Sequence, residues 1–271
     1  MRNNSIRKAY NAGRYYPSSK EEIEKFFTLF NHSLEQAEDS KERLSINPQA
    51  VIAPHGEYYL SGFTANIAHR LLAKRRVKRV VVIAAAENIP FKGVATVDFE
   101  YYETPLGELK VDRDYLGVIA THFPITLIES GYKQEYKTEI QMPFIAHYQP
   151  EVEVIELLYN DSSPKLLEEL LYWLLEDSLT SIVLSSNLSQ NVSEKLGNTL
   201  DTFAINAIAH QNISMFHEAE ASSKEGIEAL LKSTHNLNLS SHILDYRTST
   251  DVTGNPEDCT GYTSAAFCKV E

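Results

Sequence analysis

The sequence predicts an α/β fold, in which a mostly parallel central sheet carries helices on both faces and one domain spans residues 1–271. Segments with strand patterns alternate with segments of helical periodicity along most of the chain. Residues 77–86 are nearly all β-branched or small, which is typical of a central strand covered on both faces. With 271 residues, of which 43% are hydrophobic, the chain can bury a sizeable core, and it has no linker rich in Gly, Pro or Ser.

The elements follow in order from local patterns. Ser18 and Ser19 are each followed three residues later by a glutamate, which predicts a capped helix start, and apolar residues then recur at helical spacing from Ile23 to Phe30. Short apolar or alternating runs predict further strands at residues 50–53, 94–97, 125–128, 152–158, 181–185, 240–246 and 262–270. Helical spacing predicts further helices at residues 63–72, 165–175, 195–216 and 224–231.

Charge and cysteine content exclude several classes of protein. The chain has 25 basic and 37 acidic residues, a net charge of −12, which argues against non-specific binding of nucleic acid. Its one dense basic run, residues 74–79, predicts a solvated helix end. Two cysteines cannot supply a disulfide framework or a four-thiolate zinc site. Without a signal segment or an apolar run of about 20 residues, we expect a soluble, cytoplasmic protein with no nucleic-acid or membrane partner.

Polar side chains stand in three loops that each follow a predicted strand. His55 follows residues 50–53, Glu87 follows residues 77–86, and Asn187 and Gln190 follow residues 181–185. Ligands of such sheets bind beyond the carboxyl ends of the strands. His55 has the chemistry to ligate a metal, move a proton or bind a substrate. The alternative is a histidine that only orients its loop.

Each of the other candidate residues also has both a functional and a structural interpretation. Glu87 is either a metal ligand or base, or a solvated loop acid. Asn187 and Gln190 either hydrogen-bond a ligand or serve as turn and capping residues, since amides are poor acids, bases and metal ligands. Searches for dinucleotide, phosphate-loop, zinc-protease and nucleophile-elbow motifs find none in the sequence.

Seven short segments, in order along nearly the whole chain, carry a resemblance to a known family. They are residues 12–17 (AGRYYP), 51–58 (VIAPHGEY), 103–107 (ETPLG), 111–112 (VD), 139–144 (EIQMPF), 248–254 (TSTDVTG) and 261–267 (GYTSAAF). They resemble the Memo family, also known as protein B of the AmmeMemoRadiSam system. The resemblance implies a fold related to the class III extradiol ring-cleaving dioxygenases, whose non-haem iron lies in a strand-end crevice.

The resemblance also implies a metal pocket of histidines and a cysteine, and here the sequence departs from the family. His55 keeps the histidine of the family's APH motif. The other three expected ligands are replaced: the PSH histidine falls at Glu87, the histidine of SSDxSH at Gln190 (with its Asp at Asn187), and the cysteine of Cys-Gly at Ser222-Ser223. The EHS segment before residues 139–144 also differs and is Glu135-Tyr136-Lys137 here. One of four expected ligands remains, and amides and hydroxyls are weak substitutes for imidazole and thiolate.

These replacements favour a non-catalytic Memo-like protein with a degenerate metal site and no cofactor. Its crevice would bind a small molecule, a peptide or a partner protein through His55, Tyr58, Glu87, Asn187 and Gln190. One alternative is a metal-dependent oxidoreductase with a rewired site, in which His55 and Glu87 hold iron or copper and Tyr58 or Glu139 is the acid–base partner. Another is a metal-free hydrolase or lyase with His55 as its base.

Overall fold

The computed structural model describes residues 5–37, 40–128, 132–161 and 163–270. The strands in this part of the chain are β1 (Ile6–Arg7), β2 (Ala50–Ala53), β3 (Arg79–Ala85), β4 (Gly93–Thr96), β5 (Tyr101–Thr104), β6 (Gly107–Lys110), β7 (Ile125–Leu127), β8 (Glu153–Asn160), β9 (Thr180–Ser185), β10 (Leu239–Thr248) and β11 (Gly261–Lys269). The α-helices are α1 (Lys20–Gln36), α2 (Ser40–Arg43), α3 (Tyr58–Leu72), α4 (Arg113–His122), α5 (Met142–Tyr148), α6 (Pro164–Glu176), α7 (Glu194–Ala209), α8 (Ile213–Phe216), α9 (Lys224–Asn236) and α10 (Thr250–Thr253). Two short 3₁₀ helices, η1 (Tyr132–Gln134) and η2 (Glu139–Gln141), precede α5.

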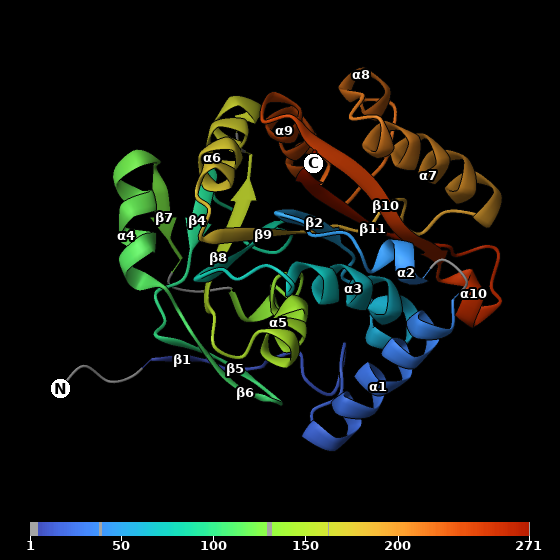
Figure 1. Cartoon of the computed structure of the whole chain (residues 1–271), viewed down its shortest axis with the longest axis horizontal. Coiled ribbons are helices and arrows are strands. Elements are labelled where there is room, and N and C mark those ends of the chain that lie inside the picture. The colour runs from blue at the N-terminus through green and yellow to red at the C-terminus, as the bar shows by residue number, and fades with distance from the viewer. Residues whose placement is uncertain (1–4, 38–39, 129–131, 162, 271) are drawn as a thin grey trace.

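The main sheet has a parallel centre and antiparallel additions. Its order is β10-β11-β2-β9-β3-β8-β4-β7 (Figure 1). Strands β2, β9, β3 and β8 are parallel neighbours, whereas β11 is antiparallel to β2 and β4 is antiparallel to β8. The α/β prediction is confirmed, and the sheet is mixed because β10 and β11 pair with each other as antiparallel neighbours at one edge. A smaller sheet joins β1, β5 and β6.

Helices cover both faces of the main sheet, as the sequence predicts. Val81 and Ile83 of β3 point into a core that α4, α6, α7 and α9 help to build. Val80 and Val82, the alternate residues of the same strand, point into a second core with α3, α5 and the smaller sheet. Side chains of a strand alternate between faces, so burial on both sides explains why this strand lacks a polar face.

Two predicted features differ in the structure. The predicted helix over residues 195–216 ends at Ala209 and resumes as α8, because Gln211 takes a left-handed backbone conformation with a φ of 49°. The basic run between α3 and β3 is only partly solvated, since Arg79 is buried and forms ion pairs with Asp112 and Asp177.

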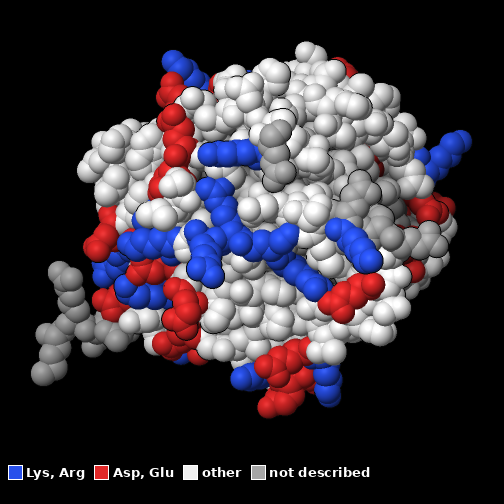
Figure 2. Space-filling view, viewed as in Figure 1, with Lys and Arg blue, Asp and Glu red and all other residues white. Residues whose placement is uncertain are grey.

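Figure 2 shows Lys and Arg side chains gathered in a band across one face of this acidic protein. In the described part of the chain, no helix combines the length and apolarity that a membrane span requires.

Gly261, the first residue of β11, lies directly against the carboxylate of Asp201. A Cβ at this position would overlap that carboxylate, which accepts the Ser189 backbone N–H and the Tyr246 hydroxyl. We expect Gly261→Ala to lower the free energy of unfolding by about 1–3 kcal/mol. The control is Gly117→Ala in α4, where the new Cβ meets nothing within 4 Å. Urea denaturation of both variants checks this, and equal stabilities would contradict it.

Candidate functional site

The three candidate loops meet at one edge of the main sheet. Strands β2, β9 and β3 are parallel neighbours, so the loops that follow them open at the same end. The backbone N–H of His55 donates to Oδ1 of Asn187 at 2.8 Å, which ties the first loop to the third. The side chain of Gln190 is exposed at the surface. The structure therefore brings His55 and Asn187 into direct contact, and places Gln190 away from the buried end of its loop.

The imidazole of His55 is fully buried and hydrogen-bonded at both nitrogens. Nδ1 lies 3.0 Å from Ser185 Oγ, and Nε2 lies 3.3 Å from Ser222 Oγ. Ser185 donates its proton to the Lys137 carbonyl and accepts the Gln141 side-chain N–H. We infer from this network that His55 carries its proton on Nδ1. Burial and the nearby charge of Lys137 hold the pKa of His55 well below its usual range, so the ring is neutral at physiological pH.

Two residues of the segment that stands where the family has EHS, Glu135 and Lys137, belong to the same site. The Lys137 side chain is 5% exposed, and its Nζ lies 3.4 Å from Oε2 of Glu87, whose side chain is 54% exposed. Glu135 is buried, and its carboxylate accepts the backbone N–H groups of Glu87 and Asn88, the latter at 2.6 Å. The segment before α5 thus supplies both Lys137, the cation of the site, and Glu135, the acid that fixes the loop after β3.

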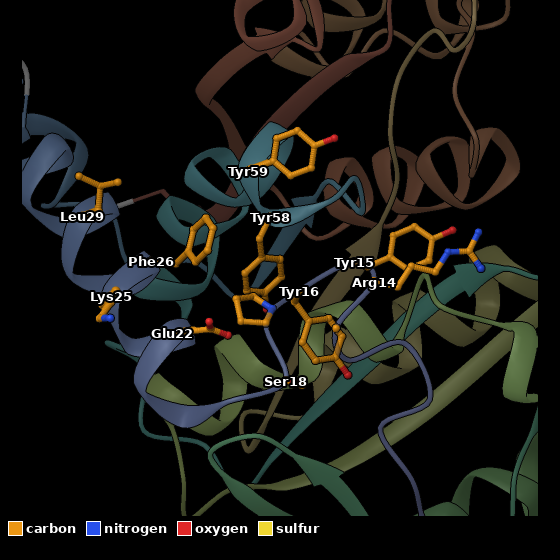
Figure 3. A pocket seen from close by; sticks show the side chains of 12 residues that line it. Arg14, Tyr15, Tyr16, Ser18, Glu22, Lys25, Phe26, Leu29, Tyr58 and Tyr59 are labelled. Carbon is orange, nitrogen blue, oxygen red and sulfur yellow. The ribbon is translucent and has the colours of Figure 1, made fainter.

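Two stacked tyrosine rings cover His55. The Tyr136 and His55 rings are nearly perpendicular, with their centroids 5.8 Å apart, and Tyr15 stacks on Tyr136 at 4.2 Å with 7° between the planes. Tyr15 also lines a cavity of about 720 Å³ beside α1 and α3, which we call the aromatic pocket (Figure 3). Its other lining residues are Gly13, Arg14, Tyr16, Pro17, Ser18, Glu22, Lys25, Phe26, Leu29, Tyr58 and Tyr59.

Tyr58 and Glu139 both have structural partners. Tyr58 is buried among aromatic rings, 4.6 Å from the centroid of Phe144, and its hydroxyl donates to the Ile140 carbonyl. Burial raises the pKa of Tyr58 well above its usual value. The carboxylate of Glu139 pairs with Arg7 at 2.7 Å and accepts the Tyr16 hydroxyl at 2.8 Å. Within the described residues, the hydrogen bonds of His55 go to Ser185, Ser222 and Asn187, and not to either of these side chains.

The donors near His55 do not form an evident metal centre. Within residues 5–37, 40–128, 132–161 and 163–270, no three His, Cys, Asp or Glu side chains are grouped so that they could hold a metal ion. The Lys137 ammonium stands beside Glu87, the carboxylate that would have to act as a second ligand. A cation at that place repels a metal ion, and two unit charges about 4 Å apart interact by about 4 kcal/mol at an effective dielectric of about 20.

Known proteins resemble this chain over almost its whole length. A family model described as Memo-like protein matches residues 7–266. A MEMO1 family protein of Nitrosopumilus maritimus is 23% identical over 275 residues, covering 97% of this chain and 99% of the relative. One of Thermotoga neapolitana is 26% identical over 277 residues, covering 96% and 99%. In fold, the chain matches the crystal structure of an uncharacterized protein of Escherichia coli K12 with a TM-score of 0.56 and 12% identity, covering 80% of this chain and 98% of that one. The family model and these relatives agree with the seven sequence segments, and the chain belongs to the Memo-like protein family.

Proposed function

We propose that this chain is a metal-free member of its family that binds a ligand at the strand-end loops and performs no metal-dependent chemistry. One observation carries the proposal: the Lys137 ammonium lies beside Glu87 and close enough to His55 to lower the pKa of its ring. A buried cation disfavours a metal ion at this place, because like charges repel strongly where water is excluded.

The surroundings of His55 support binding over catalysis. Both ring nitrogens have serine hydroxyls as partners, and the ring is fully buried. A base that abstracts a substrate proton needs a nitrogen within reach of the substrate. Here the aromatic pocket, with Tyr15 as its shared wall, offers a ligand a concave and mostly apolar surface next to the site.

Elemental analysis of the purified, tag-free protein tests the proposal, with the His55→Ala variant measured beside it. We expect iron, copper and zinc well below one equivalent in both proteins, since a lone imidazole and one carboxylate bind a metal weakly. Metal near one equivalent in the unmodified chain, lost in His55→Ala, would contradict the proposal. That result would instead favour a metal-dependent oxidoreductase whose ligands are His55 and Glu87.

A lysine variant provides the matched control. If the Lys137 charge keeps metal ions out, Lys137→Ser should bind added zinc more tightly than the unmodified chain in a competition with a chelator. Equal zinc affinities of Lys137→Ser and the unmodified chain would show that the lysine charge does not keep metal ions out of the site. The exposed pair of Lys92 with Asp161 supplies the comparison variant Lys92→Ser, which removes an exposed lysine that does not pair with Glu87.

A further inference from the structure

The ion pair of Lys137 differs from the other buried ion pairs described. Arg7 pairs with Glu139, and both side chains are buried. Arg79 pairs with Asp112 in the same way. Lys137 is equally buried, but its carboxylate partner, Glu87, is about half exposed. A buried ammonium requires a compensating anion, and here that anion sits on a side chain that water already reaches.

The other acid near Lys137 is committed elsewhere. Glu135 is buried, and both of its carboxylate oxygens accept backbone N–H groups from the loop that follows β3. Releasing Glu135 would leave its buried carboxylate without these N–H partners, which is costly. Releasing Glu87 costs little, because an exposed carboxylate regains water and side-chain freedom. Glu87 is therefore the replaceable partner of Lys137.

We propose that Lys137 binds the carboxylate group of a small organic acid, which takes the place of the Glu87 side chain on the ammonium. The proposal rests on the proposed function, because it names the ligand class of that same site. Its core is a charge-assisted N–H···O contact, a strong kind of hydrogen bond in proteins. The displaced Glu87 carboxylate turns into solvent, and no covalent bond changes.

The surrounding groups favour a monoanion with an apolar body. One ammonium balances one negative charge, and the carboxylates of Glu87 and Glu135 oppose a second one. Tyr136, the neighbour of Lys137 in the chain, stacks on Tyr15, which lines the aromatic pocket, so an apolar ligand body finds aromatic surface close to the ammonium. Burial, followed by the Glu87 carboxylate, raises the pKa of the Tyr136 hydroxyl, so this group stays protonated and can donate a hydrogen bond. Inorganic phosphate, with up to two charges and no apolar part, fits less well.

Titration of the full-length protein with benzoate, acetate and inorganic phosphate tests the proposal at constant ionic strength and pH 7.5, with binding followed by NMR chemical-shift changes and calorimetry. We expect benzoate to bind more tightly than acetate, and phosphate to bind most weakly. Glu87→Gln should bind benzoate at least tenfold more tightly, because it removes the internal competitor. Lys137→Met should bind it at least tenfold more weakly, and Lys92→Met should match the unmodified protein.

The variants separate the outcomes. Glu87 is exposed, so Glu87→Gln keeps the proposal testable even if Lys137→Met fails to fold. Unchanged or weaker benzoate binding in Glu87→Gln would overturn the displacement of Glu87. Preference for phosphate over benzoate would overturn the ligand class. Both results leave the elemental analysis untouched, so failure of the carboxylate assignment and failure of the metal-free function are distinguishable.

Discussion

Replacing Arg7 with methionine is expected to lower the free energy of unfolding by about 3–5 kcal/mol. The Arg7 guanidinium is buried and forms ion pairs with Glu139 at 2.7 Å and Glu156 at 3.3 Å. Burial alone would lower the pKa of Arg7, but these two carboxylates outweigh it and raise the pKa. Methionine keeps the apolar stem and leaves both carboxylates without their cation, which costs much more than losing an exposed pair.

Arg7 also fixes the segment that carries the candidate site. Its Nη2 donates to the Glu135 carbonyl at 3.0 Å, directly before Tyr136 and Lys137. Glu139, its main partner, accepts the backbone N–H of Asn11 and the hydroxyl of Tyr16. One buried guanidinium therefore ties the N-terminal loop that holds Tyr15 to the segment that holds Lys137. Loss of Arg7 should therefore loosen the loop that holds Tyr15 and the segment that holds Lys137, in addition to destabilising the fold.

Urea denaturation of Arg7→Met and of Lys8→Met measures this effect. Lys8 pairs with Glu103 at the surface, so its replacement should cost less than about 1 kcal/mol. The double variant Arg7→Met with Glu139→Gln should recover part of the loss, because it removes one of the stranded charges. A loss below about 1 kcal/mol in Arg7→Met would contradict the role assigned to this cation.

The sequence predicts the eight described strands of the main sheet, but it predicts neither the smaller sheet nor helix α4. Strands β2, β3 and β9 are apolar runs buried on both faces, and such runs are visible without any structure. Helix α4 buries only Ile119 among its residues, so its apolar stripe is too weak to predict from spacing. Strand β1 has two residues and owes its place to Arg7 and its partners, which come from distant parts of the chain.

Part of the candidate site can also be predicted from the strand pattern, and part cannot. Parallel strands place their following loops at one end of the sheet, so the convergence of His55 and Asn187 follows from the strand pattern. Lys137 could not be placed that way, because it lies between η1 and η2, outside any strand-end loop. The sequence signals it only as a charged residue at a position where the family has none. Tyr58 follows His55 by only three residues, yet it begins α3 and packs into the aromatic core.

A chain of hydrogen bonds links His55 to a second buried histidine. Gln141 donates to Ser185, the partner of His55, and its Oε1 lies 2.7 Å from Nε2 of His69. The His69 ring also stacks on Phe144 at 4.9 Å. Since Gln141 uses its amide hydrogens on Pro54 and Ser185, His69 must donate from Nε2. The network therefore holds each histidine in a single tautomer, with the proton on Nδ1 of His55 and on Nε2 of His69. It crosses the core beneath the candidate site.

Acid is expected to destabilise the protein through His69, with a loss of about 3 kcal/mol between pH 8 and pH 4. Burial, opposed in part by the Gln141 hydrogen bond, lowers the pKa of His69 from 6.5 to about 4 in the folded chain. Between these values the unfolded chain binds more protons than the folded one. The contribution of His69 is therefore complete above pH 6.5 and is lost as the pH falls toward 4.

The difference in unfolding free energy between the unmodified protein and His69→Gln isolates this contribution, because acid effects on other groups cancel. His69→Gln should be less stable at pH 8, where it loses the stack on Phe144, but its stability should fall less steeply, by about 2 kcal/mol less between pH 8 and pH 5. His235→Gln serves as the control, since His235 is exposed in the folded chain. Parallel pH curves for His69→Gln and the unmodified protein would mean that His69 takes up its proton without leaving the core, and that the hydrogen-bonded chain to His55 tolerates a charge.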